Sequence, residues 1–367
     1  MAFDPHREDY HRLALRFART LDDMDPTKAA KAFVNFGRRF AQDRDALPQT
    51  DADRAFHLVA EATTLIDYQL PFSTDEEAET IISRGHQLLE EALSLDPKCY
   101  DAMRMEVAGR CASFEEYYTF LLERRDEVKA RCAELAAEAR KDTSQERAQV
   151  ATDLAQRPYL RWIAMLASKA LICGRNKETL RLCEELLSLD PADTADARFT
   201  AALAYAKLED EQGLDQLETR CQAIPHLYGS QDAWMLLARL AMAHKRRDFP
   251  LARQTLARIV ELYPQAVPIL ARQRELPDGV FARLSVPPYS EDELVVAVSE
   301  ATVLFQEGRD LLARGTLGSW VLRESLTMAT SEQRADLQDM ISLAESAPGG
   351  RGLFGGPSSP SDEGGVR

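Results

Sequence analysis

A motif that recurs along the chain constrains its fold more than any other feature. The residues Glu-Ala-Leu-Ser-Leu-Asp-Pro at 91–97 return as Glu-Leu-Leu-Ser-Leu-Asp-Pro at 185–191. Shorter endings of the same kind close at Pro225 and Pro264, 34 and then 39 residues further on. A period of about 34 residues is the length of a helix–turn–helix unit that buries its apolar face by stacking on its neighbours. The sequence therefore predicts an array of helical hairpins.

Hydrophobic periodicity supports helices along most of the chain. Apolar residues recur at helical spacing over 9–21, after Pro26, over 52–68 and over 75–95. Alternation of the strand type never lasts beyond about five positions. The composition is 45% hydrophobic and only 7% aromatic, which favours packing of helices over a β-sandwich. We expect an all-α protein.

Small residues fall where the two helices of a unit would have to approach closely. Ala167 and Ala201 are 34 residues apart, and Ala238 holds the same position in the next unit. Gly174 falls at an expected turn, where glycine accepts a positive φ. Trp234, four residues before Ala238 and expected in the core, resembles the consensus first helix of the tetratricopeptide repeat. Any helical hairpin needs small contact residues, but the combined features favour an all-α, tetratricopeptide-like helical-hairpin solenoid.

The pattern divides the chain into five parts. Glycine, serine and proline dominate its last 22 residues, which cannot offset the entropy of ordering, so this tail is predicted to be disordered. The parts are N-terminal helices at 1–71, a degenerate repeat region at 72–158, tetratricopeptide-like repeats at 159–264, a proline-rich connection with C-terminal helices at 265–345, and the tail at 346–367.

Three short motifs resemble the suppression-of-tumorigenicity family of tetratricopeptide-like proteins and its uncharacterised bacterial relatives. They are Tyr-Pro-Gln-Ala-Val-Pro-Ile-Leu at 263–270, Leu-Pro at 276–277 and Ser-Glu-Asp-Glu at 290–293. The resemblance covers about 72–325, with two departures. Tyr263 replaces the asparagine that the family has before this proline, and the membrane segments of animal members have no counterpart here. It implies a helical-repeat adaptor without catalytic residues.

Charge and cysteine usage exclude several classes of protein. Asp plus Glu number 60 against 45 Lys plus Arg, giving a net charge of −15. This balance argues against nucleic acid and against an anionic membrane surface as partner. The N-terminal helices are rich in aspartate and show no basic recognition helix. The six scattered cysteines lack CxxC spacing, and we expect reduced thiols in a cytoplasmic protein.

The sequence offers no motif for catalysis. None of the six histidines lies three or four residues from another histidine or a cysteine, and no phosphate-binding loop or GxSxG motif occurs. We therefore expect no metal, no cofactor and no enzyme activity. A helical hydrolase with a site in the C-terminal region remains an alternative, although residues 265–345 contain neither His nor Cys.

Binding is then the function to expect, in a concave groove lined by the first helix of each repeat. The repeat alignment predicts that this partner site contains Arg161, Arg198, Tyr205, Met235 and Arg239. Arginine forks suit carboxylates, so an acidic peptide or a C-terminus is the expected guest. Equally, these arginines could pair with neighbouring acidic side chains. The predicted function is a protein–protein interaction scaffold, with a peptide-responsive regulatory sensor as the alternative.

Overall fold

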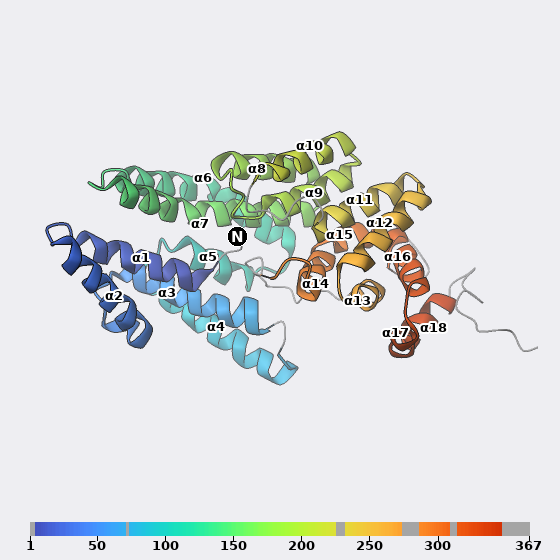
Figure 1. Ribbon diagram of the computed structural model, residues 1–367, viewed down its shortest axis with the longest axis horizontal. Helices are drawn as coiled ribbons and strands as arrows, with labels where there is room; N and C mark the ends of the chain where they lie inside the picture. Colours follow the sequence, from blue (N-terminus) through green and yellow to red (C-terminus); the bar gives the residue numbers. More distant parts are fainter. Residues whose placement is uncertain (1–3, 71–72, 225–231, 274–285, 309–313, 347–367) are drawn as a thin grey trace, which may run out of the picture. The chain divides into compact units, whose positions relative to one another are not determined.

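The computed structural model is helical throughout the part of the chain that it describes. Those residues form eighteen α-helices, a 3-10 turn and a short π-helix, and they include no strand, which confirms the all-α expectation (Figure 1). The described residues are 4–70, 73–224, 232–273, 286–308 and 314–346. The predicted disordered tail lies outside them except for Ser346, and so does the Leu-Pro motif at 276–277.

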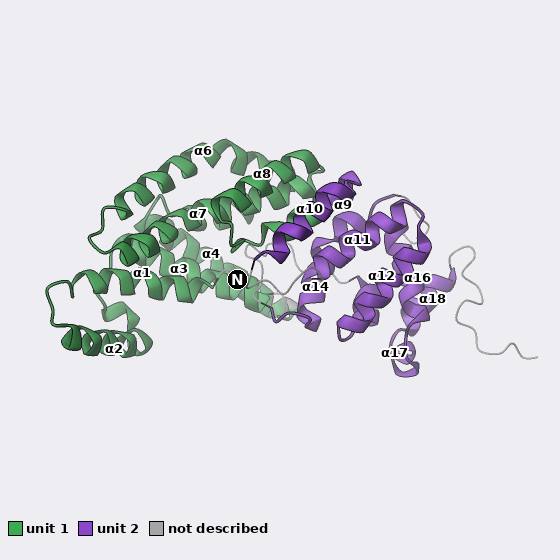
Figure 2. Ribbon diagram, turned by 45° about the horizontal axis from the view of Figure 1, so that its top comes forward, with its two compact units in different colours: residues 1–204, 277–285 green, residues 205–276, 286–367 purple. Residues whose placement is uncertain are grey.

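Contacts divide the chain into two compact units, shown in Figure 2. Unit 1 comprises residues 1–204 and 277–285, and unit 2 comprises 205–276 and 286–367. The boundary at 204/205 falls inside one continuous helix, α9 (Ala197–Leu208).

Unit 1 is built from eight helices and the first part of α9. Its elements are α1 (Pro5–Arg19), α2 (Pro26–Gln42), η1 (Arg44–Ala46), α3 (Asp51–Thr63), η2 (Thr64–Gln69), α4 (Asp75–Leu95), α5 (Tyr100–Ala108), α6 (Phe114–Ala139), α7 (Gln145–Ile172) and α8 (Asn176–Leu189).

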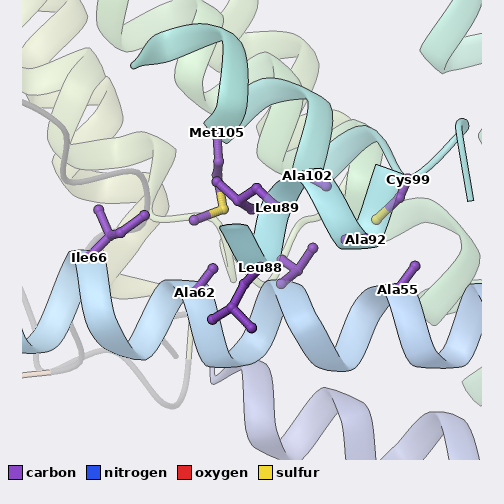
Figure 3. Packing of buried hydrophobic residues seen from close by; sticks show 10 residues of the cluster. Ala55, Ala62, Ile66, Leu88, Leu89, Ala92, Cys99, Ala102 and Met105 are labelled. Carbon is purple, nitrogen blue, oxygen red and sulfur yellow. The ribbon is translucent and has the colours of Figure 1, made fainter. Parts of the chain in front are cut away.

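Neighbouring helices of unit 1 pack as hairpins, most extensively α3 with α4, α6 with α7 and α7 with α8. One apolar cluster joins α3, η2, α4 and α5, where Ala62, Leu89, Ala92 and Ala102 are fully buried (Figure 3). Alanines at such contacts let the helix backbones approach closely. The helices thus supply the core of this unit.

The longest helix differs from the sequence expectation. A boundary between two regions was expected at 158/159, but α7 continues through Pro158 to Ile172. A proline has no N–H to donate to the carbonyl four residues earlier. Apolar side chains on both sides of it, Leu154 and Trp162 among them, are buried. Their packing keeps the helix continuous.

The described residues of unit 2 form the rest of α9 and nine further helices. They are α10 (Glu211–Gln222), α11 (Ala233–Lys245), α12 (Phe249–Leu262), α13 (Ala266–Arg272), α14 (Glu291–Glu300), α15 (Thr302–Phe305), α16 (Thr316–Thr327), α17 (Ser331–Asp336) and α18 (Gln338–Ser346).

Two of the motifs quoted above meet inside unit 2. Tyr263, after α12, donates a hydrogen bond of 2.9 Å from its hydroxyl to the Glu293 carboxylate of α14. The same carboxylate accepts from the backbone N–H of Ala233 at 3.3 Å, at the start of α11. Trp234 is 2% exposed and donates from its indole nitrogen to Glu300 at 2.6 Å. These bonds attach α14 to the α11–α12 hairpin.

Candidate partner-binding site

Arg161 lies in the interior of unit 1. Its guanidinium donates to Asp101 of α5 at 2.7 Å from Nε and to Glu8 of α1 at 2.9 Å from Nη1. Only 11% of the side chain is exposed. This residue therefore connects α7 to two other helices through buried ion pairs.

The charges around Arg161 form a compact network. Arg12 also donates to Glu8 at 2.8 Å, and Arg157 does so at 3.2 Å. Burial raises the pKa of the Asp101 carboxyl, but Arg161, Arg104 and Arg12 together lower it by more and hold that pKa at about 2. The pKa of Glu8 is lowered in the same way, against its complete burial. Both carboxylates are ionised at neutral pH.

Arg198, also in unit 1, pairs with the loop before its own helix. Nη1 lies 2.8 Å from a carboxylate oxygen of Asp193 and 2.8 Å from one of Asp196. The guanidinium carbon stands 3.9 Å from the centre of the Phe199 ring. Its side chain is 12% exposed. These contacts fix the arginine against the start of α9.

Tyr205 and Met235, both in unit 2, pack inside their helical layers. Tyr205 is half-buried on α9 against Gly213 of α10, where an added Cβ would stand 2.2 Å from the ring. Met235 is 4% exposed in the first turn of α11, which Asp232 caps. Both residues contribute to packing in this structure.

Arg239 borders a cavity in unit 2. Its Nη2 lies 2.5 Å from Glu218 and 2.6 Å from Asp215, both on α10. The side chain remains 27% exposed beside a pocket of about 720 Å³. This α11–α12 pocket is lined by Glu211, Leu236, Arg239, Met242, Ala243, Arg246, Asp248, Leu251, Gln254, Thr255, Ala257, Arg258 and Glu261.

The α11–α12 pocket combines apolar surface with paired charges. Leu251, at the start of α12, is 47% exposed although it is a large apolar residue. Arg246 pairs with Glu211, and Arg258 with Glu261 at 2.7 Å. The lining contains no histidine or cysteine. It can thus offer apolar contact and charged hydrogen bonds to a guest.

Sequence reasoning missed the half of this pocket that α12 supplies. The repeat alignment placed binding residues on first helices alone, whereas Leu251, Thr255 and Arg258 stand on the second helix of the pair. No local signal marked it: α12, which Asp248 caps, begins Phe249-Pro250-Leu251, so Leu251 stands among other apolar residues in the first turn. Only its exposure in the folded structure, 47%, distinguishes Leu251 from its neighbours.

Each of the three predicted arginines is compensated within its own unit. Arg161 and Arg198 use carboxylates of unit 1, and Arg239 uses carboxylates of unit 2. This is the pairing with neighbouring acidic side chains that the sequence left open. A guest carboxylate would have to replace one of these partners.

No group of histidine, cysteine, aspartate and glutamate that could hold a metal ion occurs among the described residues. Within the same part of the chain, no helix combines the length and apolarity needed to cross a membrane. Comparison with models of known protein families, with characterised proteins and with solved structures returned no match to this chain.

Proposed function

We propose that this chain is a non-catalytic protein–protein interaction scaffold that binds a partner peptide in the α11–α12 pocket. One observation carries the proposal: the cavity of about 720 Å³ is bordered by Arg239, which the repeat alignment had placed on the partner-facing side of its helix. Leu236, Met242 and Leu251 give the cavity apolar walls. A cavity with apolar walls and a few charged groups suits a peptide side chain.

The charges suggest how such a peptide would be oriented. Asp215, which shares Arg239 with Glu218, is 59% exposed and so is easily displaced. A carboxylate of an acidic peptide, from a side chain or a C-terminus, would take its place on the guanidinium. An apolar side chain next to that carboxylate would then enter between Met242 and Leu251.

The proposal includes a tetratricopeptide-like architecture, kinship with the suppression-of-tumorigenicity family and a cytoplasmic location. Ala167, Ala201 and Ala238 are all at most 2% exposed, as close helix contacts require. Gly174 has a φ of 74° at the turn between α7 and α8. All six cysteines are free thiols, which is typical of a reducing compartment.

Peptide selection tests the proposal. A library of random peptides displayed on phage is selected on the full chain, and the enriched peptides are measured by fluorescence anisotropy. We expect Leu251→Glu to weaken their binding at least about tenfold, since a charge in an apolar contact costs more than 1.4 kcal/mol. When the peptides are made with amidated C-termini, Arg239→Gln should weaken only those that contain aspartate or glutamate.

The matched control is Leu189→Glu, at the end of α8 in unit 1. Leu189 is 43% exposed, close to the 47% of Leu251, so both changes place a charge on an equally accessible leucine. We expect the control to bind like wild type. Selected peptides that bind wild type, Leu251→Glu and Leu189→Glu equally would show that the α11–α12 pocket is not the partner site.

A further inference from the structure

Helix α2 carries a concentration of positive charge that contrasts with the rest of the chain. Between Pro26 and Gln42 it contains Lys28, Lys31, Arg38 and Arg39 and no acidic residue. The whole chain has a net charge of −15. The charge of α2 is thus opposite in sign to that of the chain as a whole.

The four cations lie on one side of the helix. At about 100° per residue, Lys28, Lys31, Arg38 and Arg39 fall within a sector of about 100°, over a length of about 16 Å. The far side carries the aromatic rings that hold α2 to α1. Phe36, for example, stacks on Phe17 with ring centroids 4.8 Å apart. The helix therefore directs its charges away from the core.

These four side chains have no partner among the described residues. All four are exposed. Within that part of the chain none of them forms an ion pair or a side-chain hydrogen bond. By contrast, Arg44 next to α2 is buried and held by Asp9 at 2.6 Å. Unit 1 thus neutralises its interior arginines and leaves this basic stripe, Lys28, Lys31, Arg38 and Arg39, uncompensated.

A patch of apolar surface borders the basic stripe. Val34 is 58% exposed, the highest value among the large apolar side chains that remain exposed in the described residues. Ala30 and Ala41, on the same edge of α2, are exposed as well. α2 lies at the edge of unit 1, beside α1 (Figure 2). Its outer face is accessible to a partner.

Acidic residues limit what that partner can be. Asp23 and Asp25 are exposed just before α2, and Asp43 and Asp45 are exposed just after it. A flat and extended anionic surface, such as a bilayer or a nucleic-acid duplex, would bring its phosphates against these carboxylates. A short acidic segment meets only the cations between them.

From this charge complementarity we propose that the outer face of α2 docks an acidic amphipathic helix of a partner protein. Carboxylates of that helix pair with the basic stripe, and its apolar side chains cover Val34. A helix fits because its acidic and apolar side chains also run in parallel stripes. This surface lies in unit 1 and is independent of the pocket proposed above.

The test uses the full chain and a synthetic peptide about two heptads long, held helical by a side-chain staple, with leucine at a and d and glutamate at e and g, so that its length matches the basic stripe. Its glutamates also keep it from pairing with itself. We expect binding by fluorescence anisotropy that weakens as salt is added. Val34→Glu should weaken peptide binding at least about tenfold. A stripe variant, in which glutamine replaces Lys28, Lys31, Arg38 and Arg39, should weaken it by a similar factor.

A matched control separates the stripe from the overall charge. It replaces four other exposed cations of unit 1 by glutamine, and so changes the net charge by the same amount: Arg84→Gln, Lys98→Gln, Arg140→Gln and Lys177→Gln. We expect its affinity to stay within about twofold of wild type. Circular dichroism checks that each variant is folded.

Two further probes test whether a membrane or a nucleic acid binds this face instead. They are phosphatidylcholine vesicles with about a third phosphatidylserine and a DNA duplex. We expect neither to bind. The proposal is overturned if the stripe variant binds the peptide as well as wild type does. It is also overturned if vesicles or duplex bind and the peptide does not.

Discussion

At the scale of single residues, the space around a glycine decides what it does in a helix. An added Cβ at Gly213 would lie 2.2 Å from a ring carbon of Tyr205. At Gly37 in α2 the nearest atom would be the Tyr10 hydroxyl, at an ordinary 3.9 Å. One glycine therefore allows a close contact between helices, whereas the other only lowers helix propensity.

Alanine substitutions at these two positions should have opposite effects on stability. We expect Gly37→Ala to stabilise unit 1 by about 0.5–1 kcal/mol, because alanine loses less backbone entropy. Gly213→Ala should destabilise unit 2 by about 1–3 kcal/mol, because the Tyr205 ring must move. The measurement is urea unfolding of chains labelled with 5-fluorotryptophan. The fluorine NMR signal of Trp162 reports the unfolding of unit 1, and that of Trp234 reports the unfolding of unit 2. A Gly213→Ala chain as stable as wild type would contradict this close contact.

The sequence located some special residues because their cause is local. Gly174 was predicted at a turn, and its φ of 74° confirms this. No atom stands within 4 Å of its missing Cβ, so backbone conformation alone selects glycine there. The contact of Gly213 with Tyr205, by contrast, depends on how two helices meet, which no local pattern reveals.

At the scale of helices, boundaries that local side chains signal were easier to predict than a helix that depends on packing. The helix expected over 75–95 is α4, where Thr74 and Glu77 form a capping box, and Ser290 of the 290–293 motif caps α14. These signals consist of side chains bonding nearby backbone N–H groups. The continuation of α7 past Pro158 was not predicted, since it depends on packing against other helices.

The basic stripe of α2 was missed for a related reason. A net charge of −15 and an aspartate-rich N-terminal region suggested that no basic helix was present. The aspartates lie before Pro26 and after Gln42, and every charged residue of the helix itself is a cation. Charge averaged over a whole region hides a stripe on one face. Of the α11–α12 pocket, the repeat spacing predicted Arg239 on α11. It did not predict Leu251 on α12, because the alignment considered first helices only.

The contact of α7 with its neighbours gives a prediction at this scale. Ala167 is 1% exposed on a helix that packs on both α6 and α8. Ala167→Leu adds volume that these backbones cannot accommodate, so unit 1 should lose about 1–3 kcal/mol. Ala164→Leu, one turn away at a half-buried position, is the control and should change stability by less. The Trp162 fluorine signal in urea measures both. An equal, near-zero effect would show that Ala167 is not at a close contact.

At the scale of the whole molecule, the two units differ in how they hold charge. Unit 1 buries Glu8 and Asp101 among arginines, and the pKa of each carboxyl is lowered. Asp193 opposes this trend, because burial raises its pKa. In unit 2, Lys207 and Lys245 lower the pKa of Glu307 against its partial burial. Unit 1 thus depends more on ionised carboxylates in its interior.

This difference predicts that acid unfolds unit 1 before unit 2. The pKa of Asp101 falls from an ordinary 3.8 to about 2 on folding. A lowered pKa means that the native state binds fewer protons than the unfolded state. The ion pair therefore stabilises unit 1 fully above pH 3.8, and this stability is lost as the pH falls towards 2. The loss from Asp101 alone amounts to about 2 kcal/mol. The Trp162 signal should therefore shift to lower urea over this window more steeply than the Trp234 signal.

Substitution of Asp101 separates its contribution from general acid unfolding. Asp101→Asn leaves the Arg161 charge less compensated, so we expect a less stable unit 1 at pH 7. The variant can no longer gain a proton at this position, so its stability should fall less with acid, and the two chains should converge near pH 2. Asp153→Asn, at an exposed position on α7, should keep the wild-type slope. If Asp101→Asn also kept that slope, the ion pair with Arg161 could not be what makes unit 1 sensitive to acid.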